Sequence, residues 1–139
     1  MSVSCSPNRA GIFAGNRLIG TVSRYWESRE TRWLEIGLAL YDETDWGQGY
    51  GTYALPLWVS KTFVDFPELE HIGLTTWSGN HDMMRLAEKV GFKQEGRICK
   101  VRFFEGIYYD SMTYGVLRDE WFQRLSKKKR KYQIDFTVI

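Results

Sequence analysis

Three glycines stand at alternate positions in residues 46–52, which read WGQGYGT. The backbone N–H groups of a glycine-rich turn that leads into a helix point the same way, with the positive end of the helix dipole behind them. Such a nest can bind a pyrophosphate, because glycine lets a phosphate approach the backbone closely. A simple turn uses the same glycines, so the stretch by itself leaves both interpretations open.

The spacing of this loop differs from that of two common phosphate-binding motifs. A Walker loop needs Gly-Lys-Ser/Thr after its spacer, whereas Gly51 is followed by Thr52 and Tyr53. A dinucleotide fingerprint has the spacing G-x-G-x-x-G, whereas Gly47, Gly49 and Gly51 give G-x-G-x-G. Both motifs therefore fit the loop poorly.

The loop lies between a predicted strand and a predicted helix. Alternate leucine and isoleucine residues in segment 32–41 share one face of a strand, and Glu35 lies on the other face. Apolar residues at helical spacing predict an amphipathic helix over about residues 49–65. Pro56 should kink this helix or open one turn, and Pro67 should end it.

The remaining segments predict a hairpin over residues 11–22, a strand over 71–77, a helix over 81–90, a second hairpin over 92–117 and a short last helix from residue 119. The order is strand, strand, strand, helix, strand, helix, strand, strand, helix. Antiparallel hairpins are thus mixed with strand-helix-strand units, which indicates an α+β or mixed α/β fold.

The chain of 139 residues is long enough for one domain. We expect a single domain over residues 1–126 and a basic C-terminal tail over 127–139. The net charge is only +2, and much of the excess lies in the run 127–131. The body is therefore nearly neutral, and its charge does not indicate a nucleic-acid-binding surface.

The cysteines and the apolar segments bear on the compartment. Cys5 and Cys99 stand alone, without a CxxC spacing or a histidine cluster, which argues against a disulfide framework, a redox pair or a metal site. No apolar run approaches the ~18 residues of a membrane span, and residues 1–7 lack the regions of a signal peptide. We expect a cytoplasmic protein.

Several separated motifs together resemble the GNAT acetyltransferase superfamily, most closely its RimJ/RimL-like branch of protein N-terminal acetyltransferases. The motifs are WGxGYGT after a strand, Asn80 before a helix, EKVGF at residues 88–92 and Glu95-Gly96 on the next strand. They occur in the family's order within about residues 11–121. The resemblance implies a GNAT-like twisted mixed sheet with flanking helices.

The resemblance also implies acetyl-coenzyme A as cosubstrate, with no metal. The backbone of the glycine loop would hold the pyrophosphate, and Asn80 would contact the cofactor near its thiol. The strand that ends at Tyr41 would separate from its neighbour and hydrogen-bond the pantetheine arm. The implied cofactor-binding residues are Leu40, Tyr41, Trp46, Gly47, Gln48, Gly49, Tyr50, Gly51, Thr52 and Asn80.

Acetyl transfer to an amine through a tetrahedral intermediate needs few side chains. The amine attacks only when neutral, so a carboxylate or a water held by one must remove a proton, and a positioned N–H must stabilise the oxyanion. Related enzymes often carry a glutamate in the sequence E-I-G, which makes Glu35 the candidate catalytic base. The alternative for Glu35 is a solvent-exposed strand residue paired with an arginine.

The sequence departs from the family pattern at several positions. Met83 replaces a serine and Ala87 a tyrosine that would assist the thiolate, so the thiolate is expected to leave unaided or to take a proton from water. Tyr53 replaces a glutamate at the helix start. A strand and one or two helices normally precede the first hairpin, but only about ten residues do so here. Either the chain is a fragment or a second subunit completes it, as in a homodimer whose sheet edges are exposed or paired.

The expected function is transfer of an acetyl group from acetyl-CoA to a primary amine, either a protein N-terminus or a small molecule. The identity of this amine acceptor remains open. A weak or inactive acetyl-CoA-binding sensor or assembly module is the first alternative, suggested by Met83 and Ala87. A nucleic-acid-binding protein led by the basic tail is the second, and a membrane partner is not expected.

Overall fold

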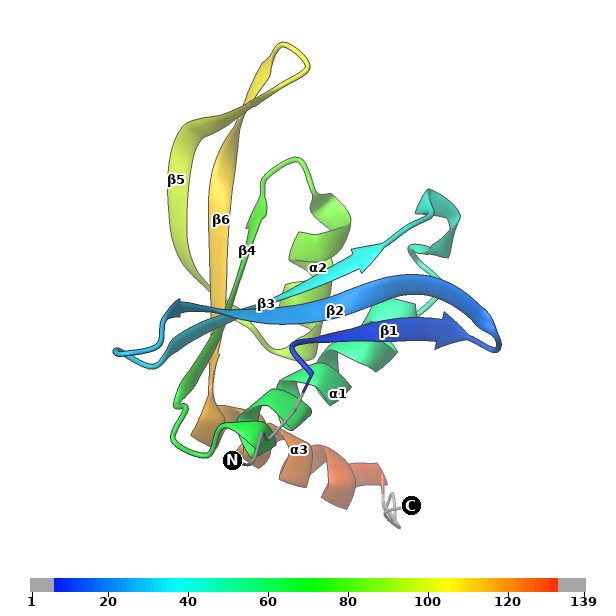
Figure 1. Cartoon of the computed structure of the whole chain (residues 1–139), viewed down its shortest axis with the longest axis vertical. Helices are drawn as coiled ribbons and strands as arrows, with labels where there is room; N and C mark the ends of the chain where they lie inside the picture. The colour runs from blue at the N-terminus through cyan, green and yellow to red at the C-terminus, as the bar shows by residue number, and fades with distance from the viewer. Residues whose placement is uncertain (1–6, 133–139) are drawn as a thin grey trace.

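The computed structural model describes residues 7–132 as a six-stranded sheet with three α-helices (Figure 1). The elements in chain order are β1 (Arg9–Ala14), β2 (Arg17–Ser28), β3 (Trp33–Leu40), the 3-10 turn η1 (Glu43–Asp45), α1 (Tyr50–Asp65), β4 (His71–Trp77), α2 (His81–Val90), β5 (Lys93–Phe104), β6 (Ile107–Leu117) and α3 (Arg118–Tyr132). The predicted element order and the α+β class are confirmed. Cys5 and residues 133–139 of the expected tail lie outside the described residues.

The middle of the sheet contains a fork. The strand order is β1-β2-β3-β4-β6-β5, and β3 and β4 form its one parallel pair within the described chain. Their ladder holds two residue pairs, Leu34 with Ile72 and Glu35 with Gly73. Beyond these pairs the two strands diverge (Figure 1). The separation that the resemblance implied for this strand is therefore present, and it begins at Glu35.

One face of the sheet forms the core together with all three described helices. Its strands contribute alternate apolar residues, and the helices add side chains that are almost fully buried, such as Leu55 and Phe63 from α1, Ala87 from α2 and Trp121 from α3. Glu35 and its cross-strand neighbours lie on the opposite face. None of the described helices contributes to that face, which we call the open face.

Two helices differ in detail from the sequence prediction. Helix α1 continues through Pro56 without interruption. Helix α3 extends to Tyr132 and includes the basic run at residues 127–131, so it is longer than the short helix predicted. Lysine and arginine are good helix formers, which explains the extension. The boundary expected at residue 127 therefore falls inside a helix.

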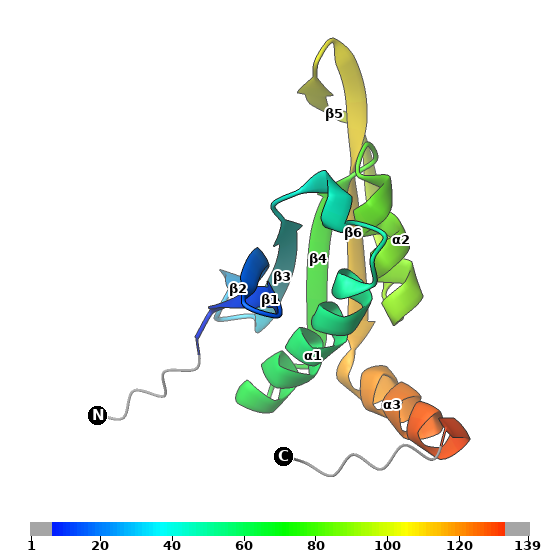
Figure 2. The ribbon, with the colours of Figure 1, turned by 90° about the vertical axis from the view of Figure 1, so that its right-hand side faces the viewer.

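The β5–β6 hairpin extends beyond the rest of the molecule (Figures 1 and 2). Nearly every residue of β5 is exposed, so the alternation of its sequence does not correspond to one buried face. The pairing with β6 shifts register twice, between Gln94 and Gly96 and between Ile98 and Arg102. We call residues 98–108 of this hairpin the tongue.

Candidate functional site

The glycine loop connects η1 to α1 and has two residues in the left-handed backbone region. Gly47 has a φ of +79°, and Gly49, which caps the N-terminus of α1, has a φ of +88°. A Cβ atom at either position would meet no atom within 4 Å. Their conformation favours glycine, and the space in front of the loop is open. No side chain caps the first turn of α1, so its backbone N–H groups can bind an anion.

Gly51 has a different role from the other two glycines. It is buried inside α1, and a Cβ atom there would lie 2.8 Å from Cδ2 of Leu86 on α2. The absence of a side chain at this position therefore lets α1 and α2 pack closely. This packing role is additional to the predicted role of Gly51 in phosphate approach, which stays a prediction, and Gly51 also lines the groove described below.

Two polar contacts hold the chain that leads into the loop. The Asp42 carboxylate caps η1 by accepting hydrogen bonds from the backbone N–H and the hydroxyl of Thr44, each at 2.9 Å, and these bonds lower the pKa of Asp42. The Arg17 guanidinium binds both carboxylate oxygens of buried Asp45, at 3.0 and 3.2 Å. The turn of the first hairpin is thereby tied to the start of the glycine loop.

A groove of about 280 Å³ lies between the glycine loop and α2. Of the expected cofactor-binding residues, it brings together Leu40, Trp46, Gly47, Gly49, Gly51 and Thr52. It does not include Tyr41, Gln48, Tyr50 or Asn80. Residues that the sequence did not predict complete the groove, namely Asp45, Asp82, Arg85, Leu86 and Lys89.

Arg85 and Lys89 are the functional candidates that sequence reasoning missed. They lie four residues apart on α2, so they occupy the same side of the helix, and both border the groove. Cations beside a nest of backbone N–H groups suit a phosphate ligand. The i, i+4 spacing of two cations on the helix after Asn80 was the signal available in the sequence.

Asn80 acts as the N-cap of α2. Its side-chain oxygen accepts a hydrogen bond of 3.1 Å from the backbone N–H of Met83, as expected for a helix cap. The Met83 side chain is buried in the core, and Ala87 is fully buried. Neither of these two positions offers a proton donor, and a contact between Asn80 and the cofactor stays a prediction.

Glu35 lies at the vertex of the fork, on the open face, and is only 6% exposed. Its Oε1 atom accepts hydrogen bonds from the Thr75 hydroxyl at 2.8 Å and the Tyr25 hydroxyl at 3.2 Å. Burial and then the Glu35 carboxylate raise the pKa of Tyr25 to about 12, so this phenol stays protonated as a donor at neutral pH. The alternative of a solvent-exposed glutamate paired with an arginine is wrong, since Glu35 is buried and no ion pair to it occurs among residues 7–132.

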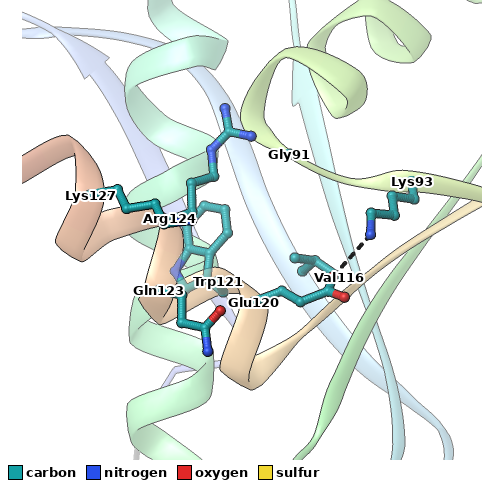
Figure 3. Close-up of a pocket in the computed structure, with 8 residues that line it drawn as sticks. All are labelled: Gly91, Lys93, Val116, Glu120, Trp121, Gln123, Arg124 and Lys127. Atoms are coloured by element: carbon teal, nitrogen blue, oxygen red, sulfur yellow. Dashed lines mark ion pairs between the residues drawn. The ribbon is translucent and has the colours of Figure 1, made fainter.

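A cavity of about 530 Å³ lies elsewhere, between α3 and the connection from α2 to β5 (Figure 3). Two of its charged residues are already engaged. Lys93 pairs with Glu120 at 3.5 Å, and Arg124 donates to the carbonyl oxygen of Lys89 at 2.9 Å, at the end of α2. Arg124 also lies over Gly91, which has a φ of +109°. These contacts join α3 to α2.

Within residues 7–132, no group of three or more His, Cys, Asp and Glu residues is placed to hold a metal ion. His71 pairs instead with Glu95, Nε2 to Oε1, at 2.8 Å. No helix in this part of the chain has the length and apolar character needed to cross a bilayer.

The fork with an acidic residue at its vertex, and the glycine loop at the start of the next helix, are the features of an acyltransferase fold. The chain matches the family of acetyltransferase (GNAT) domains over residues 6–93. It belongs to this family, as the resemblance of its motifs indicated.

Individual relatives agree with this assignment. The chain is 27% identical over 110 residues to an uncharacterized SPbeta prophage-derived N-acetyltransferase, YokL, of Bacillus subtilis, covering 79% of this chain and 61% of the relative. It is also 27% identical to the putative ribosomal N-acetyltransferase YdaF of the same organism, covering 81% and 60%. The latter agrees with the RimJ/RimL-like branch. The chain spans about 60% of the length of these curated relatives.

A solved structure shares the fold. The spermidine N-acetyltransferase of Vibrio cholerae in complex with CoA and spermine superposes with a TM-score of 0.71 at 23% identity, covering 82% of this chain and 67% of that one. At this identity the likeness concerns the fold alone.

Proposed function

We propose that this chain transfers the acetyl group of acetyl-CoA to a primary amine. The observation that carries the proposal is the fork, with buried Glu35 at its vertex and the glycine loop at the start of α1. In this arrangement the pyrophosphate binds the N–H groups of residues 47–52, flanked by Arg85 and Lys89. Backbone groups of β3 beyond Glu35 face the gap and are free to bind the pantetheine arm.

Each residue then has a defined task in the reaction. The Glu35 carboxylate takes a proton from the ammonium form of the acceptor, which leaves a neutral amine. The amine nitrogen forms a bond to the thioester carbonyl carbon, the carbon–sulfur bond breaks, and the second proton of the nitrogen passes to the departing thiolate. A backbone N–H at the fork stabilises the oxyanion. The thiolate leaves without help from residues 83 or 87, where the chain has Met and Ala.

The acceptor is a primary amine on either a protein N-terminus or a small molecule. One relative is named as a putative ribosomal N-acetyltransferase, and one structural neighbour contains spermine. Both kinds of acceptor are cationic before they react, and no described helix covers the open face beside Glu35. The protein is also proposed to be cytoplasmic, because Cys99 is a free, exposed thiol.

The competing function is an acetyl-CoA-binding module without turnover, favoured by buried Met83 and Ala87. Release of free thiol during incubation with acetyl-CoA separates the two functions. The assay compares spermidine, a peptide with a free N-terminus and the same peptide N-acetylated. We expect thiol release with at least one free amine and none with the blocked peptide. Binding of acetyl-CoA without turnover on either amine would favour the module.

We further propose that the protein is a homodimer. The tongue carries six large apolar side chains that are each more than half exposed, namely Ile98, Val101, Phe103, Phe104, Ile107 and Tyr108. The charges along the hairpin are nearly balanced, with four cations and three carboxylates in residues 93–110. Such a surface suits a copy of itself better than a strongly charged partner.

A further inference from the structure

The Glu35 carboxylate is held asymmetrically on the open face. Thr75 of β4 and Tyr25 of β2 both donate to Oε1, from opposite sides of β3. No donor to Oε2 occurs among the described residues. One oxygen therefore has two fixed partners, and the other remains available as an acceptor.

The free oxygen lies beside a glycine. A Cβ atom on Gly73, the cross-strand partner of Glu35, would lie 3.4 Å from Oε2. The same Cβ position is 3.3 Å from Cε1 of His71. The space above Gly73 is thus bounded by Glu35 on one side and by His71, paired with Glu95, on the other.

We propose that Tyr25 and Thr75 are positioning residues that occupy Oε1 and so make Oε2, above Gly73, the oxygen that takes the acceptor's proton. The inference rests on the proposed role of Glu35 as base. In the step, the N–H bond of the ammonium breaks and an O–H bond forms at Oε2, while the electron pair stays on nitrogen. The amine then lies above Gly73, next to the vertex of the fork where the thioester is expected.

Other charged groups near this cluster leave the arrangement intact. Glu27 on β2 raises the pKa of Tyr25 and Arg102 on β5 lowers it. His71 is held by its hydrogen bond with Glu95. Because the raised pKa of Tyr25 keeps it protonated, both hydroxyls remain donors over the whole range in which an amine acceptor is tested. The hydrogen bonds from Tyr25 and Thr75 to Glu35 therefore do not change with pH near neutrality.

The first test needs no activity. Tyrosine labelled with ¹³C in its ring reports the titration of Tyr25, identified by its loss in Tyr25→Phe. We expect Glu35→Gln to lower the pKa of Tyr25 from about 12 part of the way toward its ordinary value of 10.0. An unchanged pKa of Tyr25 would show that its phenol does not bind the Glu35 carboxylate, which overturns the positioning role of Tyr25.

The second test is kinetic and uses a matched pair at Thr75. Thr75→Val removes the hydroxyl without changing the shape and should lower kcat by about ten- to a hundredfold, as expected for a hydrogen bond to a charged group. The acidic limb of the pH–rate profile should move to higher pH. Thr75→Ser, which keeps the hydroxyl, should keep most of the wild-type kcat and the wild-type position of the acidic limb. The control is Thr113→Val, at the cross-strand partner of Thr75 on β6.

The third variant, Gly73→Ala, places a methyl group in the space above Gly73, 3.4 Å from Oε2 and 3.3 Å from Cε1 of His71, so the His71 ring must shift slightly to admit it. It should lower kcat/KM for the amine at least tenfold and leave the Kd for CoA unchanged. An active wild type whose Thr75→Val and Gly73→Ala variants keep full rates would overturn the positioning role alone. A wild type that acetylates neither spermidine nor the free peptide would overturn the proposed function and this role together.

Discussion

At the scale of single residues, Arg85 and Lys89 add positive charge to a groove whose floor is glycine backbone. A backbone nest can bind a phosphate without side chains, but cations strengthen the contact and make it sensitive to salt. The opposing charge of Asp82 in the same groove limits the net attraction. The contribution of each cation can therefore be measured.

Replacing Arg85 by Gln should raise the Kd for CoA roughly tenfold, because it removes a hydrogen-bond donor that carries a charge. The effect should shrink at high ionic strength. Isothermal titration calorimetry with CoA measures it, and Lys93→Gln, in the cavity beside α3, serves as the control. A Kd for Arg85→Gln equal to that of wild type would exclude Arg85 from the phosphate site.

Sequence reasoning identified the glycine loop but not the reason for each glycine. Gly47 and Gly49 are required by their backbone conformation, which a glycine-rich turn before a helix already suggests. Gly51 is required by Leu86, a residue 35 positions along the chain that contacts it only after α1 and α2 pack. Close packing between distant segments leaves no local signal, and for the same reason the polar neighbours of Glu35 were not predictable.

At the scale of elements, Asp110 of β6 shapes the β5–β6 hairpin. Its carboxylate accepts a hydrogen bond of 2.9 Å from the backbone N–H of Lys100, and it also binds Arg97. Lys100 has a φ of +55° where the register of β5 shifts. Asp110 also exchanges backbone and hydroxyl hydrogen bonds with Ser78, just before α2. The hairpin was predicted. The β-bulge where the register of β5 shifts, between Ile98 and Arg102, was not, because it depends on a side chain of the opposite strand.

Asp110 should make stability depend on pH. The Lys100 N–H and then Arg97 hold the pKa of Asp110 below its ordinary value of 3.8. Its stabilising effect is therefore fully present above pH 3.8 and is lost as the pH falls through the lower folded pKa. Asp110→Asn should reduce the free energy of unfolding at neutral pH, and the difference from wild type should close in acid.

Urea unfolding of both chains at neutral and at acidic pH measures this difference. Because the same wild type and variant are compared at each pH, the acid responses of Asp42 and Asp65, whose pKa values are also lowered, cancel. A difference that stays equal at both pH values would mean that the Asp110 charge does not hold the bulge.

At the scale of the whole molecule, the open face and the tongue distinguish this chain from a closed globular domain. An exposed aromatic side chain contributes on the order of 100 Å², so the six apolar residues of the tongue together expose several hundred Å². The area is divided between the two faces of the hairpin, since Phe103 pairs with Tyr108 and Phe104 with Ile107 at neighbouring positions. Its total approaches the roughly 800 Å² that each partner buries in a standard interface. The sequence predicted the strands of the hairpin. It could not predict that both faces of the hairpin are exposed, because this depends on how far the hairpin extends beyond the helices.

We expect light scattering to give twice the chain mass of 16.3 kDa at micromolar concentration. Phe103→Ser, on the tongue, should shift the mass toward the monomer, while Tyr53→Ser, at a still more exposed aromatic on α1, should not. In the dimer, Cys99 on the tongue should react more slowly with a maleimide than it does in the Phe103→Ser variant. A wild type that is strictly monomeric at these concentrations would contradict the dimer.

Binding of CoA to the glycine loop can be measured with one matched pair of variants. Gly49 and Gly15 both have a positive φ and open space at the Cβ position, and asparagine tolerates this conformation better than most residues. Gly49→Asn should therefore fold as Gly15→Asn does but place a side chain in front of the nest. Calorimetry with CoA should give the wild-type Kd for Gly15→Asn and a Kd at least tenfold higher for Gly49→Asn. Equal affinity in the folded Gly49→Asn protein would contradict CoA binding at the glycine loop and leave the loop as a simple turn.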